Sequence, residues 1–150
     1  MPRKLNKFAQ EIKDIYQQVE KSLSQEVCQK IKVGGWVKSI RSSKNISFIT
    51  LNDGSGLPNL QIVCPSHLAK KIKNANFGSC LMIEGQLVST PNRNQKIELQ
   101  SQKIELVNPA AEDYPFQKQT IPLEVVRNYP HLRTKTSYFL AVFKLRSQIS

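Results

Sequence analysis

The chain has 150 residues, the length of about one domain, and 22 Lys and Arg against 11 Asp and Glu give it a net charge of +11. Its 39% hydrophobic content excludes wholesale disorder, and no apolar run approaches the ~18 residues needed to span a bilayer. The N-terminus lacks the apolar block of a secretory signal, so we expect a cytoplasmic protein with no membrane partner. The positive charge favours a polyanionic partner, most simply nucleic acid.

Residues 1–30 carry apolar residues at the 3/4 spacing that predicts an amphipathic helix docked on a domain. These apolar residues are Leu5, Phe8, Ile12, Ile15, Tyr16 and Val19. A second interpretation stays open, because Arg3, Lys4 and Lys7 cluster at the start and could form an arm that contacts RNA.

Residues 31–107 change to a period of two, which predicts five strands and one short helix. The predicted strands are about Lys30–Arg41, Ile46–Asn52, Pro58–Cys64, Cys80–Val88 and Gln95–Val107. The helix follows Pro65 and extends to about Asn76, and Gly34-Gly35 would permit a bend or bulge in the first strand. Three strands, a helix and two strands is the order of the OB-fold, an all-β five-stranded barrel that often binds oligonucleotides. Ten basic and four acidic residues give this segment a net charge of +6.

Residues 108–135 are predicted to be a hinge or linker, because prolines punctuate the start of this segment. A second helical pattern begins at Thr136 and continues to Ser150, and it is apolar on nearly every side. Such a helix is normally buried. We therefore expect residues 136–150 to be the front end of something longer, or to dock on another chain.

Strand parity separates an inward apolar set from an outward set in the second, third and fifth predicted strands. The inward set is Ile49, Leu51, Leu60, Ile62, Cys64, Ile97 and Leu99. Phe48, Gln61 and Glu98 then point outward from the barrel. A ring that stacks on a base contributes ~1–3 kcal/mol, and an amide and a carboxylate can hydrogen-bond to base edges.

Alternatives to this site remain open at the level of the pattern. Phe48 would be a core residue if the parity is off by one, and Gln61 and Glu98 could be ordinary solvated strand residues. The basic residues Lys38, Arg41 and Lys44 lie near one end of the first two predicted strands, where they form either a solvated face or a set of phosphate contacts.

Catalytic and metal-binding motifs are missing from the sequence. The cysteines, Cys28, Cys64 and Cys80, lack CxxC spacing, so we expect reduced thiols and no metal site. There is no GxxxxGK loop, nucleophile elbow or HExxH motif, and therefore no catalytic residue is predicted.

Several motifs together closely resemble the N-terminal anticodon-binding domain of asparaginyl-tRNA synthetases. They are Gly35-Trp36-Val37, Arg41-Ser42-Ser43-Lys44, Phe48 to Ser55, Asn59-Leu60-Gln61, Gly85 to Pro91, Gln95 to Leu99, Asp113-Tyr114-Pro115 and His131 to Thr136. The resemblance covers residues 31 to 150, and the string Asn52-Asp53-Gly54-Ser55 favours the asparagine enzymes over their aspartate and lysine relatives.

The resemblance implies roles for four residues in binding the tRNA anticodon loop. Phe48 matches the aromatic residue that stacks on the central uridine, and Gln61 matches the amide that reads it. Arg41 matches a basic residue that contacts the loop, and Glu98 matches an acidic residue near the anticodon. Lys44 is added to the predicted RNA-binding residues because of its charge and its position near Arg41.

The resemblance also implies a larger enzyme, a class II asparagine–tRNA ligase that is a homodimer and uses ATP and Mg. Its catalytic domain would begin in residues 136–150, and the present chain on its own would be inactive. Two alternatives stay open: a free-standing OB protein that binds tRNA or single-stranded nucleic acid, and the aspartate-specific relative.

Overall fold

The computed structural model describes residues 9–21, 29–56, 58–90, 96–116 and 121–150. These residues belong to two compact units, Met1–Gln117 and Lys118–Ser150. The predicted arm at Arg3, Lys4 and Lys7 and the apolar residues Leu5 and Phe8 lie outside the described residues.

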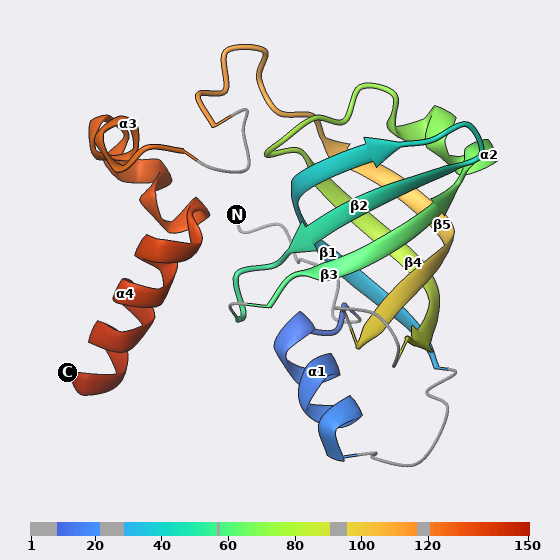
Figure 1. Ribbon diagram of the computed structural model, residues 1–150, viewed down its shortest axis with the longest axis horizontal. Coiled ribbons are helices and arrows are strands. Elements are labelled where there is room, and N and C mark those ends of the chain that lie inside the picture. The colour runs from blue at the N-terminus through green and yellow to red at the C-terminus, as the bar shows by residue number, and fades with distance from the viewer. Residues whose placement is uncertain (1–8, 22–28, 57, 91–95, 117–120) are drawn as a thin grey trace, which may run out of the picture. The chain divides into compact units, whose positions relative to one another are not determined.

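Five strands form a closed barrel in the first unit (Figure 1). The strands are β1 (Lys30–Ser42), β2 (Ile46–Asn52), β3 (Leu60–Pro65), β4 (Cys80–Ser89) and β5 (Ile97–Asn108). They pair in the order β1-β2-β3-β5-β4, and β4 closes the barrel on β1. The pair β3–β5 is parallel and the other pairs are antiparallel. The predicted OB-fold topology is thereby confirmed.

The interior of the barrel is filled by alternate residues of the strands. The fully buried members from β2, β3 and β5 are Ile49, Leu51, Leu60, Ile62, Cys64, Ile97 and Leu99. These are the residues that strand parity predicts to point inward. Their burial removes apolar surface from water and supplies the main stabilisation of the barrel.

A β-bulge in β1 changes which of its residues face outward. The pairing with β2 shifts between Val37 and Ser39, so that Lys38 is the extra residue. Beyond the bulge, Ile40 pairs with Ile49 and Arg41 pairs with Phe48. The sequence indicated that Gly34-Gly35 would permit a bend or bulge, but the register of β1 is continuous there and shifts between Val37 and Ser39. Close packing explains the glycine at position 35, because a Cβ there would lie 2.8 Å from the carbonyl oxygen of Asn52.

The helix α1 (Ile12–Lys21) covers one end of the barrel, and its first turn is capped by the loop after β2 (Figure 1). The amide of Ile12 donates a hydrogen bond to Asp53 Oδ2 at 2.7 Å, and that of Lys13 donates to Ser55 Oγ at 3.1 Å. The first amides of a helix have no acceptor within the helix, and a carboxylate also suits its positive end. Ile12 and Ile15 are buried in the barrel core, which confirms a docked amphipathic helix for this part of residues 1–30.

Tyr16 makes the docking of α1 sensitive to alkaline pH. Its hydroxyl donates a hydrogen bond to the carbonyl of Asn59 at 2.9 Å, and burial raises the pKa of the phenol above its ordinary value of 10.0. A raised pKa in the folded state means that the neutral phenol stabilises the fold below pH ~10 and that this contribution is lost as the pH rises through the folded pKa.

We therefore expect the free energy of unfolding to fall more steeply above pH ~10 in the wild type than in Tyr16→Phe, which has no proton to lose at this position. Urea unfolding at a series of pH values measures the difference. Tyr114, whose pKa burial also raises, is present in both proteins and cancels. Parallel curves for the two proteins would contradict the role of Tyr16.

The opposite end of the barrel is covered by the short helix α2 (Ser66–Ala69) and the 3-10 turn η1 (Lys70–Ile72) (Figure 1). Leu68 and Ile72 are their buried residues. The prediction that this helix continues to Asn76 is wrong. The amide of Asn76 donates to Ser79 Oγ, which in turn donates to Asn76 Oδ1 at 2.8 Å. Such local side-chain bonds favour a turn over helix.

The second unit contains α3 (Leu123–Asn128), the 3-10 helix η2 (Pro130–Lys135) and α4 (Ser137–Ile149). The segment 108–135 was predicted to be a hinge or linker, and the structure forms α3 and η2 within its second half. Arg133 stacks over the ring of Phe139 at 5.7 Å and donates to the carbonyl of Arg127.

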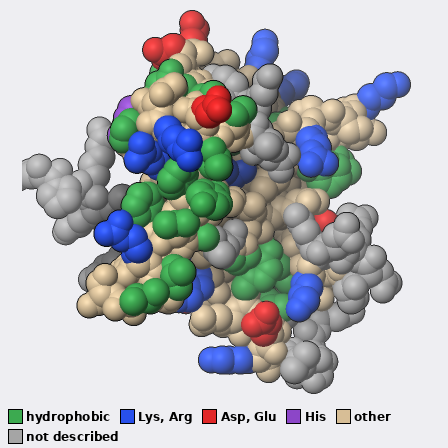
Figure 2. Space-filling view, turned by 60° about the vertical axis from the view of Figure 1, so that its left-hand side comes forward, with side chains coloured by type: hydrophobic (Ala, Val, Ile, Leu, Met, Phe, Trp, Pro, Cys, Tyr) green, Lys and Arg blue, Asp and Glu red, His purple; other side chains and the backbone are tan. Residues whose placement is uncertain are grey.

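The predicted helix near residue 136 is confirmed as α4, but no residue of α4 is buried. Figure 2 shows hydrophobic side chains gathered on the face that it presents. Those exposed on α4 are Tyr138, Val142, Phe143, Leu145 and Ile149. None of the helices described here is long and apolar enough to cross a membrane.

Candidate nucleic-acid interface

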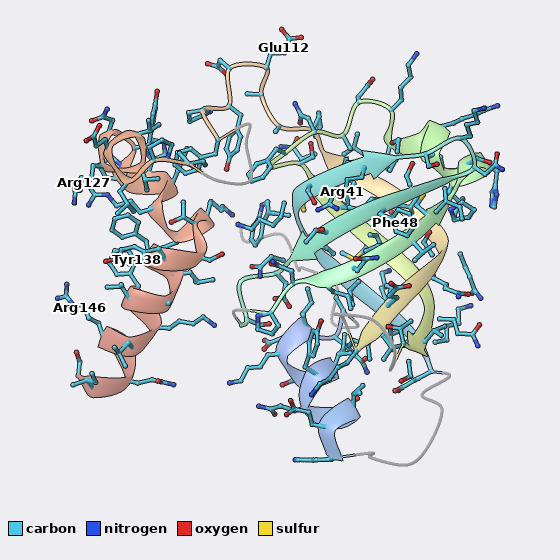
Figure 3. The ribbon with its side chains drawn as sticks, in the orientation of Figure 1. Arg41, Phe48, Glu112, Arg127, Tyr138 and Arg146 are labelled. Carbon is cyan, nitrogen blue, oxygen red and sulfur yellow. The ribbon has the colours of Figure 1, made fainter. Side chains whose placement is uncertain are left out.

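Two rows of outward residues run across neighbouring strands on the wall of the barrel. The first row follows the register Ser39, Thr50, Gln61, Glu98 and Val88, and the second follows Arg41, Phe48, Val63, Gln100 and Gln86. The rows bring Arg41, Phe48, Gln61 and Glu98 together on one face, and Figure 3 marks Arg41 and Phe48 on the adjoining strands β1 and β2.

Phe48 and Gln61 are placed so that both can touch one base. Phe48 pairs with Val63, and Gln61 lies two residues along β3, which makes it the diagonal neighbour of Phe48. Diagonal neighbours on antiparallel strands are ~7–8 Å apart, within the reach of an aromatic side chain. Phe48 is partly exposed, and no other described ring packs on it. Its ring is therefore available for stacking.

Gln61 is oriented by Glu98, which lies beside it on the parallel strand β5. Gln61 Nε2 donates a hydrogen bond to Glu98 Oε1 at 3.1 Å. A carboxylate accepts and does not donate, so the bond determines which end of the amide faces Glu98. The amide oxygen of Gln61 is thereby directed away from Glu98. The parity prediction for Glu98 is right in direction, but the side chain is only 7% exposed and is not an ordinary solvated residue.

The basic residues predicted for the site lie at the end of the barrel that α2 covers. Arg41 is exposed beside Phe48, and this position depends on the bulge at Lys38. Lys44 is exposed in the loop between β1 and β2, outside the two rows. Lys44 is therefore not brought against Gln61 or Glu98.

Charge is distributed unevenly over the barrel. On β1 and β4, Lys32 pairs with Glu84 at 3.2 Å, and this hydrogen bond lowers the pKa of the Glu84 carboxyl. At the α2 end, the exposed cations do not pair with any carboxylate of the described residues. These cations are Arg41, Lys44, Lys70, Lys71 and Lys73. The positive potential is therefore concentrated at the end of the barrel beside Phe48.

Three further residues of this face were not singled out from the sequence. Thr50 accepts a hydrogen bond from Ser39 across the strands at 2.9 Å, and Val63 lies between Phe48 and Gln100. Strand parity already contained the signal for Thr50 and Val63. The place of Gln100 depends on the β3–β5 register, for which the sequence has no local signal.

Other kinds of site find little support in the described part of the chain. No group of three or more His, Cys, Asp and Glu side chains comes together there to hold a metal ion. Cys64 is a buried free thiol, and Cys28 lies outside the described residues. Burial raises the pKa of the Cys64 thiol, which keeps it protonated and unreactive.

The chain is similar to known proteins over most of its length. An asparagine–tRNA ligase of Clostridium tetani is 38% identical over 138 residues, covering 91% of this chain and 29% of that protein. A human asparaginyl-tRNA synthetase is 39% identical over 122 residues, covering 80% of this chain and 25% of that protein. The chain thus spans less than a third of the curated relatives that it matches.

The fold also has a counterpart among solved structures. An asparaginyl-tRNA synthetase from Pyrococcus horikoshii, complexed with asparaginyl-adenylate, matches with a TM-score of 0.67 and 22% identity over 80% of this chain and 29% of that one. Residues 31–107, the segment that forms the barrel, match the family described as OB-fold nucleic acid binding domain. By its sequence and its barrel, the chain belongs to the family of OB-fold nucleic acid binding domains.

Proposed function

We propose that this chain is the anticodon-binding part of an asparagine–tRNA ligase. The observation that carries the proposal is the outward set of Phe48, Gln61 and Glu98, in which the amide of Gln61 is held by Glu98 at 3.1 Å beside an available ring. The similarity to asparagine–tRNA ligases over 91% of the chain supports the same assignment.

The geometry suits a uracil base. A uracil stacked on Phe48 presents an N–H donor next to a carbonyl acceptor on its pairing edge. The amide oxygen of Gln61 would accept from that N–H, and the second N–H of its amide would donate to the carbonyl. A cytosine presents the opposite pattern, and reading it would turn the amide oxygen of Gln61 towards the carboxylate of Glu98. Glu98 therefore acts as a positioning residue for the selection of uridine.

Arg41 and Lys44 would contact the phosphates of the same loop. Phosphate contacts orient an RNA on a protein, while base contacts carry the sequence information. Arg41 lies next to Phe48 in the strand pairing, and Lys44 follows it in the adjoining loop. Together they would position the anticodon loop over the ring.

The remaining activity would belong to the longer enzyme that its relatives represent. In that enzyme ATP and Mg²⁺ would be used to form the adenylate. The enzyme would be a dimer of two identical subunits and would act in the cytoplasm. Of that enzyme, this chain would contribute tRNA binding, while the residues that bind ATP would lie in a catalytic part beginning near α4.

The direct test is binding of an asparagine tRNA anticodon stem-loop to the chain at several salt concentrations. Each phosphate that a cation neutralises contributes about −0.7 to the slope of log K against log salt for single strands, so we expect a steep loss of affinity with salt. An affinity that does not change with salt concentration, or no binding to the stem-loop, would contradict the proposal. Fluorescence anisotropy measures both.

The same titration separates the two alternatives. The asparagine and aspartate anticodons differ at the third base, uridine against cytidine, so an aspartate-specific chain would prefer the cytidine loop. A free-standing module for single-stranded nucleic acid would bind an unstructured oligonucleotide as tightly as the stem-loop, because stacking on Phe48 tolerates any base.

A further inference from the structure

A hollow of about 450 Å³ opens at the α2 end of the barrel, between the β1–β2 loop and the turn η1. Three lysines line it: Lys44 from the loop, and Lys70 and Lys73 from the opposite side. Ile46 and Ile72 contribute apolar surface, and Ser42 and Ser47 contribute hydroxyls that bond to each other at 3.1 Å.

The composition of this hollow fits a nucleotide. Among the described residues no acidic side chain lines it, its cations suit phosphodiester oxygens, and its apolar residues suit a ribose or base. A second hollow, of about 780 Å³ around Trp36, has the opposite character. Glu11, Asp53 and Glu105 line it, and their charge would repel a phosphate backbone.

The hollow begins one residue pair beyond Phe48, on the inner side of the β1–β2 hairpin, because the buried Ser47 alternates with the outward Phe48. In the β1–β2 register the pair Arg41 and Phe48 is followed directly by the pair Ser42 and Ser47, which already lines the hollow. Lys44 lies in the connecting loop, at the rim. An RNA strand whose base stacks on Phe48 would reach the hollow with its adjacent nucleotide by passing over the β1–β2 loop at Lys44.

We propose that this hollow binds the phosphodiester backbone of the nucleotide next to the one that stacks on Phe48, with Lys70 and Lys73 as phosphate contacts; this rests on the proposed binding of an anticodon loop. The hollow would extend the RNA-binding surface from the barrel wall to its α2 end. It would contribute affinity without sequence preference.

The test uses the whole chain and the anticodon stem-loop, with the double variant Lys70→Gln, Lys73→Gln. Removal of two phosphate contacts should reduce the salt slope by about 1.4 and the affinity at 0.1 M salt roughly 25-fold. Lys71→Gln is the matched control, because Lys71 is exposed on the same turn but does not line the hollow. We expect little change in its slope.

A second readout identifies the phosphate. An uncharged methylphosphonate placed next to the stacked nucleotide should weaken binding to the wild type and have little further effect in the double variant, since the two changes remove one interaction. If the double variant behaves like Lys71→Gln while the wild type still binds, the hollow is not a backbone site. If the wild type itself fails to bind the stem-loop, the proposed function fails first.

Discussion

Phe48→Ala is expected to weaken binding of the anticodon stem-loop by ~1–3 kcal/mol, roughly 5- to 150-fold, and to leave the barrel folded. The ring lies on the outer wall between Arg41 and Val63, and the inward positions on either side of it belong to Ser47 and Ile49. Its loss therefore removes a stacking surface without opening a cavity. Anisotropy titration gives the affinity, and circular dichroism on heating gives the stability.

Trp36→Ala is the control for this prediction. Trp36 is an aromatic residue of β1 that is also exposed on the barrel wall, at 38%. It borders a different hollow, which Asp53 and Glu105 line. The Trp36→Ala substitution should leave the affinity for the anticodon stem-loop nearly unchanged. A loss of ~3–5 kcal/mol in the free energy of unfolding for Phe48→Ala, with unchanged affinity per folded molecule, would mean that Phe48 is a core residue.

Gly85→Ala is expected to destabilise the barrel by about 3 kcal/mol, enough to lower the melting temperature by roughly 6–12 °C. A Cβ at Gly85 would overlap the carbonyl oxygen of Gln100 and press on the backbone of Ser101. The β4–β5 pairing shifts register at this position, so the strands approach closely there. The obstacle is backbone within a closed barrel and cannot rotate away. Thermal unfolding of the variant measures the effect.

Gly34→Ala provides the comparison on the neighbouring strand. A Cβ at Gly34 would meet the terminal methyl of Met82 at 3.0 Å, and that flexible side chain can move. Its cost in the free energy of unfolding should therefore be much smaller. Equal stabilities for Gly85→Ala and the wild type would show that the β4–β5 register is different from the one described.

Local sequence patterns predicted the barrel well because its strands have one buried face. The alternation through Ser47 to Leu51 and Leu60 to Cys64 follows directly from that burial, and it also directs Phe48 and Gln61 outward. The same rule fails in β1, because the bulge at Lys38 depends on pairing with β2. Without the bulge, Arg41 would share the parity of Val37 and point inward.

Other features could not be predicted because their partners lie far apart in the sequence. The cap of α1 is the carboxylate of Asp53, 41 residues away, and the bond that orients Gln61 comes from Glu98, 37 residues away. The helices in 123–135 are short and start after Pro122 in a proline-containing segment, which resembles a linker. Such pairings arise from the tertiary fold.

The central claim is that Gln61, held by Glu98, reads a uridine stacked on Phe48. The most direct measurement compares the affinity of the chain for two anticodon stem-loops that differ only in the central base, uridine or cytidine. Recognition of the base by two hydrogen bonds predicts a preference for uridine of ~1–3 kcal/mol. Glu98→Gln should reduce this preference, because the introduced amide can both donate and accept and therefore no longer dictates the orientation of Gln61. Equal affinity for the two stem-loops in the wild type would contradict the account.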